Sequence, residues 1–294
     1  MIGLNRVIQV FCFLCDRLFQ GRAVSTSLRM KRFIPFTKKD PTVAVIRLSG
    51  AIGGAGRGVL NDVGLRDVVE KAFVKGKPAA VALEINSPGG SPTQSSLIAS
   101  RIRRLADEKE VPVYAFVEDV AASGGYWLAC AADEIYVDQA SVVGSIGVIS
   151  AGFGAHVFLA RQGIERRVYT AGNSKSMLDP FRPEKEEDVE RLKDLLEQMH
   201  TLFIDHVKRR RGARLSKDQD LFTGEIWVGD QARSLGLVDG VGHLAPVMRE
   251  KFGEKVRFRR YGQRRSPFQR LGLRLMQDAS AHLEEQALFG RFGL

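Results

Sequence analysis

Residues 79–109 read AAVALEINSPGGSPTQSSLIASRIRRLADEK, and their pattern is the basis for predicting the fold class. Ala79–Ile85 is apolar and predicts a buried strand, and the paired glycines of Asn86–Gly90 allow a ligand close to the backbone. Ser91–Lys109 then predicts an amphipathic helix. Its inward face is expected to carry Leu97, Ile98, Ile102 and Leu105. This order of strand, turn and helix is typical of an α/β domain with largely parallel strands.

The same alternation extends on both sides of this unit. A helix capped by Asn61 or Asp62 is expected, and a long helix is expected from Pro183 to Arg211, ending at Gly212. Apolar residues recur along this long helix at steps of three and four. Further strands are predicted at Val43–Leu48, Val111–Val117, Ile135–Val137 and Val168–Thr170.

Three segments follow from the composition. Residues 1–40 are a basic, weakly apolar extension, residues 41–261 are the α/β domain, and residues 262–294 are a basic tail with an amphipathic helix expected at Ala279–Leu288. Hydrophobic residues make up 44% and charged residues 27% of the 294 residues, which excludes a disordered or collagen-like chain.

The basic charge lies at the two ends of the chain. The formal net charge is +10, of which residues 1–39 contribute +7 and residues 249–274 contribute +8, so the rest is mildly acidic. This distribution argues against a nucleic-acid groove formed by the whole fold and suits contact with an anionic membrane surface or another subunit.

The first 39 residues leave three interpretations open. The uncharged run Val7–Cys15 is too short to span a bilayer and resembles a weak signal-peptide core. It is an interfacial anchor, a poor signal, or part of an overcalled start with Met30 as the alternative. Cys12 and Cys15 lack the context of a redox motif, and the three cysteines cannot form a disulfide framework.

Two glycine-containing turns carry candidate chemistry. The backbone N–H groups of Gly89 and Gly90 can stabilise an oxyanion. Ser123, in Ala121–Trp127, is expected at the start of a short helix after a strand, as in a nucleophile elbow, with the Gly124 N–H directed the same way. Taken alone, the first turn is also compatible with an ordinary strand–helix connection and the second with a helix N-cap.

A nucleophilic serine requires a base. None of the five histidines lies in a suitable small-residue turn, and His200 and His206 fall in the long helix, where a structural role is expected. Lys175 lies in a loop after the predicted Val168–Thr170 strand. A lysine serves as a base when desolvation keeps it neutral.

Four separated motifs, in order, resemble the SppA/SohB family of signal peptide peptidases, also called protease IV. The resemblance extends from Val43 to Val241 and includes the downstream segments TGEIW (223–227) and ARSLGLVD (232–239). The four motifs are NSPGG (86–90), ASGGYW (122–127), GSIGVI (144–149) and GNSKS (172–176).

The resemblance implies a single-repeat ClpP/crotonase-like fold of stacked ββα units and a Ser/Lys dyad. It implies Ser123 as nucleophile, Lys175 as base and Ser145 as the residue that hydrogen-bonds the base. Gly124 and the Gly89/Gly90 pair are implied as oxyanion donors, with Gly90 the less certain. No metal or organic cofactor is implied.

The expected activity is that of a serine endopeptidase acting on unstructured apolar peptides, such as cleaved signal peptides or membrane-protein fragments. A homo-oligomeric ring or dome is implied, with serine and lysine from neighbouring subunits. The expected location is cytoplasmic or peripheral at the inner membrane, without nucleic acid as a partner. A crotonase-like acyl-CoA enzyme and a non-catalytic membrane scaffold remain as alternatives.

Overall fold

The computed structural model describes residues 40–54, 59–172, 174–262, 289–290 and 292. Residues 1–40 are one unit of the chain and Pro41–Leu294 are another, and all elements below belong to the second unit. The expectations for Val7–Cys15, for Cys12 and Cys15, for Met30 and for a helix at Ala279–Leu288 lie outside the described residues.

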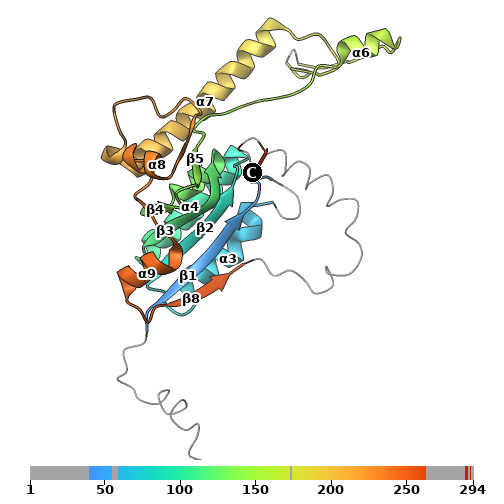
Figure 1. The fold of residues 1–294 in the computed structure, drawn as a ribbon. Helices are drawn as coiled ribbons and strands as arrows, with labels where there is room; N and C mark the ends of the chain where they lie inside the picture. The colour runs from blue at the N-terminus through green and yellow to red at the C-terminus, as the bar shows by residue number, and fades with distance from the viewer. Residues whose placement is uncertain (1–39, 55–58, 173, 263–288, 291, 293–294) are drawn as a thin grey trace, which may run out of the picture. The chain divides into compact units, whose positions relative to one another are not determined.

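A largely parallel sheet forms the centre of this unit, with the strand order β6-β5-β3-β2-β1-β8 (Figure 1). Strand β4 pairs with β3 and β7 beside this path, and among the strands of the described residues only β5 and β6 pair antiparallel. The expected α/β fold with largely parallel strands is therefore confirmed. The strands are β1 Thr42–Ser49, β2 Ala80–Ser87, β3 Val113–Ala122, β4 Glu134–Val137, β5 Val142–Gly144, β6 Ile226–Val228, β7 Gly240–Val241 and β8 Arg257–Tyr261.

Local sequence signals account for the helix ends. The Asn61 side chain caps α3 by accepting a hydrogen bond of 2.8 Å from the Gly64 N–H. The Ser91 hydroxyl caps α4 by accepting a longer hydrogen bond, of 3.4 Å, from the Gln94 N–H. Gly212, at a φ of 56°, ends α7 as expected. The helices are α3 Asp62–Val74, α4 Pro92–Lys109, α5 Gly124–Ala129, α6 His156–Arg161, α7 Glu186–Arg211, α8 Gly229–Ser234 and α9 Leu244–Phe252, with a 3₁₀ turn at Gly212–Arg214.

The two faces of the sheet are covered differently. Alternate strand residues such as Leu83 and Ile85 pack with α3, α4 and α5 in the main core. On the opposite face, Val247 and Met248 of α9 pack with Val43, Val45 and their neighbours. Ile98, Ile102 and Leu105 are buried as predicted. The prediction for Leu97 is wrong: its side chain is 46% exposed, because it lies about 100° around α4 from Ile98, on the side away from the other buried residues.

Two expectations for residues 164–211 are wrong. Val168–Thr170 has no strand partner, and all three side chains are half-buried or exposed. Helix α7 begins at Glu186, three residues after Pro183, and only its last turns bury apolar side chains such as Phe203 and Val207. Helical periodicity predicts an apolar face but does not identify what covers it.

No helix in the part of the chain described here combines the length and the apolar character needed to cross a bilayer.

Candidate active site

Ser123 connects β3 directly to α5 in a strained backbone conformation. Its φ is 51° and its ψ is −120°, a combination rarely adopted by a residue with a side chain. Its N–H donates to the Gly144 carbonyl at 2.8 Å, and its own carbonyl accepts from the Trp127 N–H at 3.0 Å. A serine held this way at a strand–helix turn matches the geometry of a nucleophile elbow.

The turn Asn86–Gly90 lies against Ser123 and requires its glycines. A Cβ at Gly89, where φ is 101°, would lie 2.8 Å from both the Ser123 Cβ and the Gly124 nitrogen. A Cβ at Gly124 would lie 3.4 Å from the Gly90 nitrogen, and a Cβ at Gly90 would collide with the Ile52 carbonyl oxygen. The two glycine-containing turns predicted from the sequence therefore meet in space.

Backbone and side-chain hydrogen bonds fix this turn. The Ile52 N–H donates to the Gly89 carbonyl and the Ser91 N–H donates to the Ile52 carbonyl, both at 2.8 Å. Ser87 is fully buried, and its hydroxyl donates to the Gly50 carbonyl at 2.7 Å while accepting from the Gly89 N–H at 3.3 Å. The role of Ile52 has no local motif, because it depends on contact between segments far apart in the chain.

Two N–H groups beside the serine remain available. Within the described residues, neither the Gly90 N–H nor the Gly124 N–H has a backbone or side-chain acceptor. The Gly89 N–H, in contrast, is already directed at the Ser87 hydroxyl. Two unpaired donors close to a nucleophile are the arrangement that stabilises a developing oxyanion.

Ser145 leaves the sheet next to Ser123. Ala122 and Gly144 are paired in the parallel β3–β5 ladder, so the two serines follow neighbouring strand ends. Ser145 also has a positive φ, of 51°, and its N–H donates to the Glu225 carbonyl at 2.6 Å. A cavity of about 540 Å³ opens beside it, lined among others by Glu225, Trp227 and Phe292.

Lys175 lies apart from these groups in the single chain. Its side chain is exposed, and no hydrogen bond or ion pair of the described residues joins it to Ser123 or Ser145. The preceding Ser174 hydroxyl accepts from Arg191 of α7 at 2.6 Å, whereas His200 of α7 lies 3.0 Å from the Ile146 carbonyl, next to Ser145. Arg191 and His200 are nine positions apart on α7, about 14 Å along the helix axis.

The C-terminal half of α7 holds the helix that follows the serine. Trp127 of α5 stacks on Phe203 and on His206, with ring centroids 4.9 and 4.7 Å apart. A His206 ring nitrogen also lies 3.2 Å from the Trp127 carbonyl. Burial lowers the pKa of His206 to about 4, so this histidine is neutral at pH 7 and structural, as expected.

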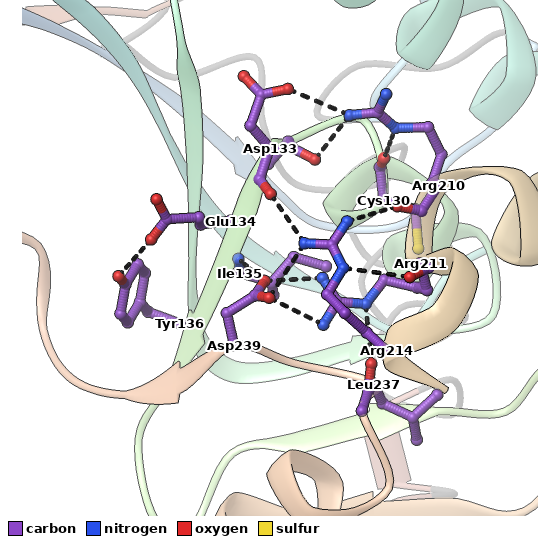
Figure 2. Close-up of polar contacts among 12 residues, drawn as sticks. Cys130, Asp133, Glu134, Ile135, Tyr136, Arg210, Arg211, Arg214, Leu237 and Asp239 are labelled. Atoms are coloured by element: carbon purple, nitrogen blue, oxygen red, sulfur yellow. Dashed lines mark hydrogen bonds and ion pairs between the residues drawn. The ribbon is translucent and has the colours of Figure 1, made fainter. Parts of the chain in front are cut away.

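Charged side chains at the end of α7 complete this attachment (Figure 2). Arg210 donates to the Cys130 and Ala132 carbonyls at 2.8 and 2.9 Å, and Arg211 donates to Asp239 at 2.7 Å. Although burial opposes its ionisation, hydrogen bonding and the charge of Arg211 hold the pKa of Asp239 below its usual value. The sequence indicated only that basic residues end the helix. Their inward contacts depend on residues far away in the chain.

Cys130 is not activated as a nucleophile. Cys130 is fully buried behind α5, and burial raises the pKa of its thiol to about 12. The thiolate is therefore negligible at neutral pH. Among the described residues, no group of three or more His, Cys, Asp or Glu side chains is arranged to hold a metal ion.

Comparison with known proteins gives a family match and several relatives. The model for Peptidase family S49 matches residues 106–255. The chain is 46% identical over 286 residues to a Brucella melitensis protein named Na(+)/H(+) antiporter NhaA, covering 90% of this chain and 39% of that protein. It is 33% identical over 211 residues to the chloroplastic serine protease SPPA of Arabidopsis thaliana, covering 69% of this chain and 31% of that protein. A Synechocystis protein named as a protease is 30% identical over 210 residues, covering 71% and 73%.

Proposed function

Because this chain belongs to peptidase family S49, the family of the SppA and SohB proteases, we propose that it is a serine endopeptidase with Ser123 as its nucleophile. The observation that carries the proposal is the meeting of strained Ser123 with the unpaired N–H groups of Gly90 and Gly124. A fold match alone would not favour a nucleophile, whereas this geometry provides both the attacking group and the oxyanion donors.

In the proposed reaction, the Ser123 Oγ attacks the scissile carbonyl carbon while its proton passes to the neutral Nζ of Lys175. The carbonyl oxygen becomes an oxyanion, which accepts hydrogen bonds from Gly124 and Gly90. Gly90 is favoured over Gly89 as donor, since the Gly89 N–H is directed at Ser87.

The intermediate then breaks its C–N bond, and the Lys175 ammonium returns the proton to the leaving amine. Water then attacks the acyl carbon as Lys175 takes its proton. The bond between that carbon and the Ser123 Oγ breaks, the Lys175 ammonium returns the proton to the Ser123 Oγ, and the second peptide leaves with a new carboxyl group. Ser145 is proposed to orient the lysine through a hydrogen bond. Its position at the strand end next to Ser123 supports that role.

We propose that Lys175 acts on Ser123 of a neighbouring subunit. The lysine loop contacts α7 at Arg191, whereas His200 of the same helix lies next to Ile146, the neighbour of Ser145. The distance between these two points of α7 supports this arrangement. Leu195, Met199 and Leu202 are 41–63% exposed on the same helix, and a second copy of the chain would cover them. A ring or dome built from such heterologous contacts would complete each active site.

We propose unstructured apolar peptides as substrates, among them cleaved signal peptides and membrane-protein fragments. The cavity beside Ser145 has mixed walls, in which Ile226, Trp227 and Phe292 offer apolar contacts next to polar groups such as Glu225, and the apolar contacts support this class. An extended peptide can enter this cavity, whereas a folded substrate would be kept out by its own bulk.

Peptide hydrolysis by the purified full chain tests the proposal. Ser123→Ala is expected to reduce kcat/KM for an apolar peptide by at least about a thousandfold. Ser100→Ala is the matched control, since Ser100 is an exposed serine on α4, outside the site. Hydrolysis that survives Ser123→Ala, or capture of the chain on immobilised CoA, would favour a crotonase-like enzyme instead.

A further inference from the structure

The cavity beside Ser145 carries an anionic group in its wall. Among the described residues that line it, Glu225 is the sole acid, and none is a lysine or an arginine. The Glu225 backbone carbonyl accepts from the Ser145 N–H. Its carboxylate, in contrast, takes part in no hydrogen bond or ion pair within the part of the chain that the structure describes. The wall of the cavity is therefore negatively charged.

Two strand pairs connect Glu225 to the catalytic turn. Ile226 of β6 pairs with Gly144 of β5, which in turn pairs with Ala122 of β3. Glu225 adjoins one end of this row and Ser123 adjoins the other. Because neighbouring strands lie about 4.8 Å apart, roughly 10 Å separate the two positions across the sheet. An extended peptide covers that distance in about three residues, so the cavity would receive a side chain about three positions from the cleaved bond.

We infer that this cavity is a subsite for a lysine or arginine side chain of the substrate, and that the Glu225 carboxylate selects it. The inference rests on the proposed peptidase function. Lysine and arginine combine an apolar stem with a charged head. The walls offer a partner for each part, since Ile226 and Trp227 can contact the stem while Glu225 pairs with the head. The volume of about 540 Å³ is that of a small-ligand pocket.

The inference narrows the substrate class to apolar peptides with a basic residue near the cleaved bond. A signal peptide has this order, because a positively charged segment precedes its apolar core. Gln231 also lines the cavity and can accept a hydrogen bond from the cationic head, but it carries no charge. Discrimination between a cation and a neutral side chain of the same shape therefore depends on Glu225, which also disfavours an acidic residue at this position.

Binding is measured first, on a full chain carrying Ser123→Ala, so that no peptide is consumed. The probe is a fluorescently labelled apolar peptide in which a single lysine, norleucine or glutamate is moved along the sequence. At one position, the lysine peptide should bind about fivefold more tightly than its norleucine counterpart, and added salt should reduce the difference. Equal binding of lysine and norleucine at every position would overturn the inference.

Two variants of Glu225 separate charge from shape. Glu225→Gln keeps the size of the side chain and should bring the lysine-to-norleucine binding ratio close to one. Glu225→Lys should reverse the preference in favour of the glutamate peptide. The matched control is Glu254→Gln, because Glu254 is an exposed glutamate beyond the end of α9, and its ratio should equal that of the parent chain. A preference for lysine that survives both Glu225 variants would contradict the assignment.

The same ratios are then measured as kcat/KM on the active chain, because a ratio of two peptides cancels any effect on catalysis that they share. The lysine peptide should be favoured about fivefold, and Glu225→Gln should remove this advantage. A loss of activity in Glu225→Gln that is equal for all peptides would place Glu225 among the catalytic groups and overturn the inference. Lysine-selective binding without hydrolysis of any peptide would contradict the proposed peptidase function, while the assignment of the cavity would stand.

Discussion

The Arg211 guanidinium and the Asp239 carboxylate form a buried ion pair at 2.7 Å, where the Arg211 side chain is only 2% exposed. Arg211 also donates to the Gly236 carbonyl at 2.9 Å, and Arg214 reaches the other Asp239 oxygen at 3.1 Å (Figure 2). This pair joins the end of α7 to the segment that leads into β7. Helix α7, which packs against Trp127 of α5, is thereby held in place by side chains at its C-terminal end.

We expect Arg211→Ala to reduce the free energy of unfolding by about 3 kcal/mol, because the Asp239 carboxylate loses its buried cationic partner and keeps Arg214, whose side chain is more exposed. Arg209→Ala is the control, since Arg209 is an exposed neighbour on the same helix. Denaturant unfolding followed by circular dichroism measures both variants. Equal free energies of unfolding for the two variants would show that the ion pair with Asp239 does not stabilise the attachment of α7.

Acid should destabilise the fold through His206. Its folded-state pKa of about 4 lies below the ordinary value of 6.5, so only the unfolded chain binds a proton between these values. Stability is therefore fully present above about pH 6.5 and falls as the pH decreases toward 4, by about 3 kcal/mol for this group. Unfolding free energies measured between pH 4.5 and 7 test the slope.

The matched variants for that experiment are His206→Phe and His243→Gln. His206→Phe keeps an aromatic ring beside Trp127 but cannot titrate, so its stability should depend less on pH. His243 is exposed, with its ring nitrogen 3.4 Å from Asp138, and its replacement should leave the slope unchanged. A slope that persists in His206→Phe would assign the acid sensitivity to another group.

Gly90→Ala should lower kcat by at least about a hundredfold, as expected when an oxyanion donor is displaced. The added methyl group would collide with the Ile52 carbonyl oxygen, so the turn must shift away from Ile52 and displace the Gly90 N–H. The control is Gly54→Ala, because nothing lies within 4 Å of a Cβ there. Thermal unfolding accompanies the kinetics, and near-normal kcat in folded Gly90→Ala would exclude this N–H from the reaction.

Mixing two inactive chains tests the shared site. Ser123→Ala and Lys175→Ala should each be inactive alone, and co-expression should restore activity at about a quarter of the interfaces of a randomly mixed ring. Lys217→Ala is the exposed-lysine control and should stay active. Rings shown by native mass spectrometry to be mixed, yet without activity, would place serine and lysine in one chain.

The exposed apolar residues of α7 offer an independent test of assembly. Leu195→Gln combined with Leu202→Gln should shift the particle mass toward the monomer and reduce activity in parallel, because the covering contact is lost. Leu97→Gln replaces a leucine of similar exposure, 46%, on α4 and should change neither. Sedimentation that is identical for all three proteins would argue against an interface on α7.

Local signals predicted most of the elements but not every partner. Caps at Asn61 and Ser91 and the apolar strand around Leu83 are encoded within a few residues, so the fold class could be inferred. Val168–Thr170 has strand-forming residues but no neighbouring strand, and pairing is a tertiary property.

The candidate site divides in the same way. The turns at Gly89–Gly90 and Ser123–Gly124 could be predicted because each motif is contiguous. Their mutual contact through Ile52, and the covering of Ala122 by Phe292, join segments that no spacing rule connects. The role of Lys175 stays a prediction, because no hydrogen bond among the described residues joins its loop to Ser123.

Helix α7 contacts the serine helix through Trp127 at one end and the lysine loop through Ser174 near the other. In the proposed ring, one copy of α7 therefore serves two consecutive catalytic centres. A subunit with a damaged α7 would disable the catalytic centres on both of its sides. One defective copy would therefore also inactivate a centre to which an intact neighbour contributes. If a quarter of the copies were defective, roughly 56% of the centres would remain complete, because each centre needs two intact copies of α7. Activity would therefore fall by more than the fraction of defective copies.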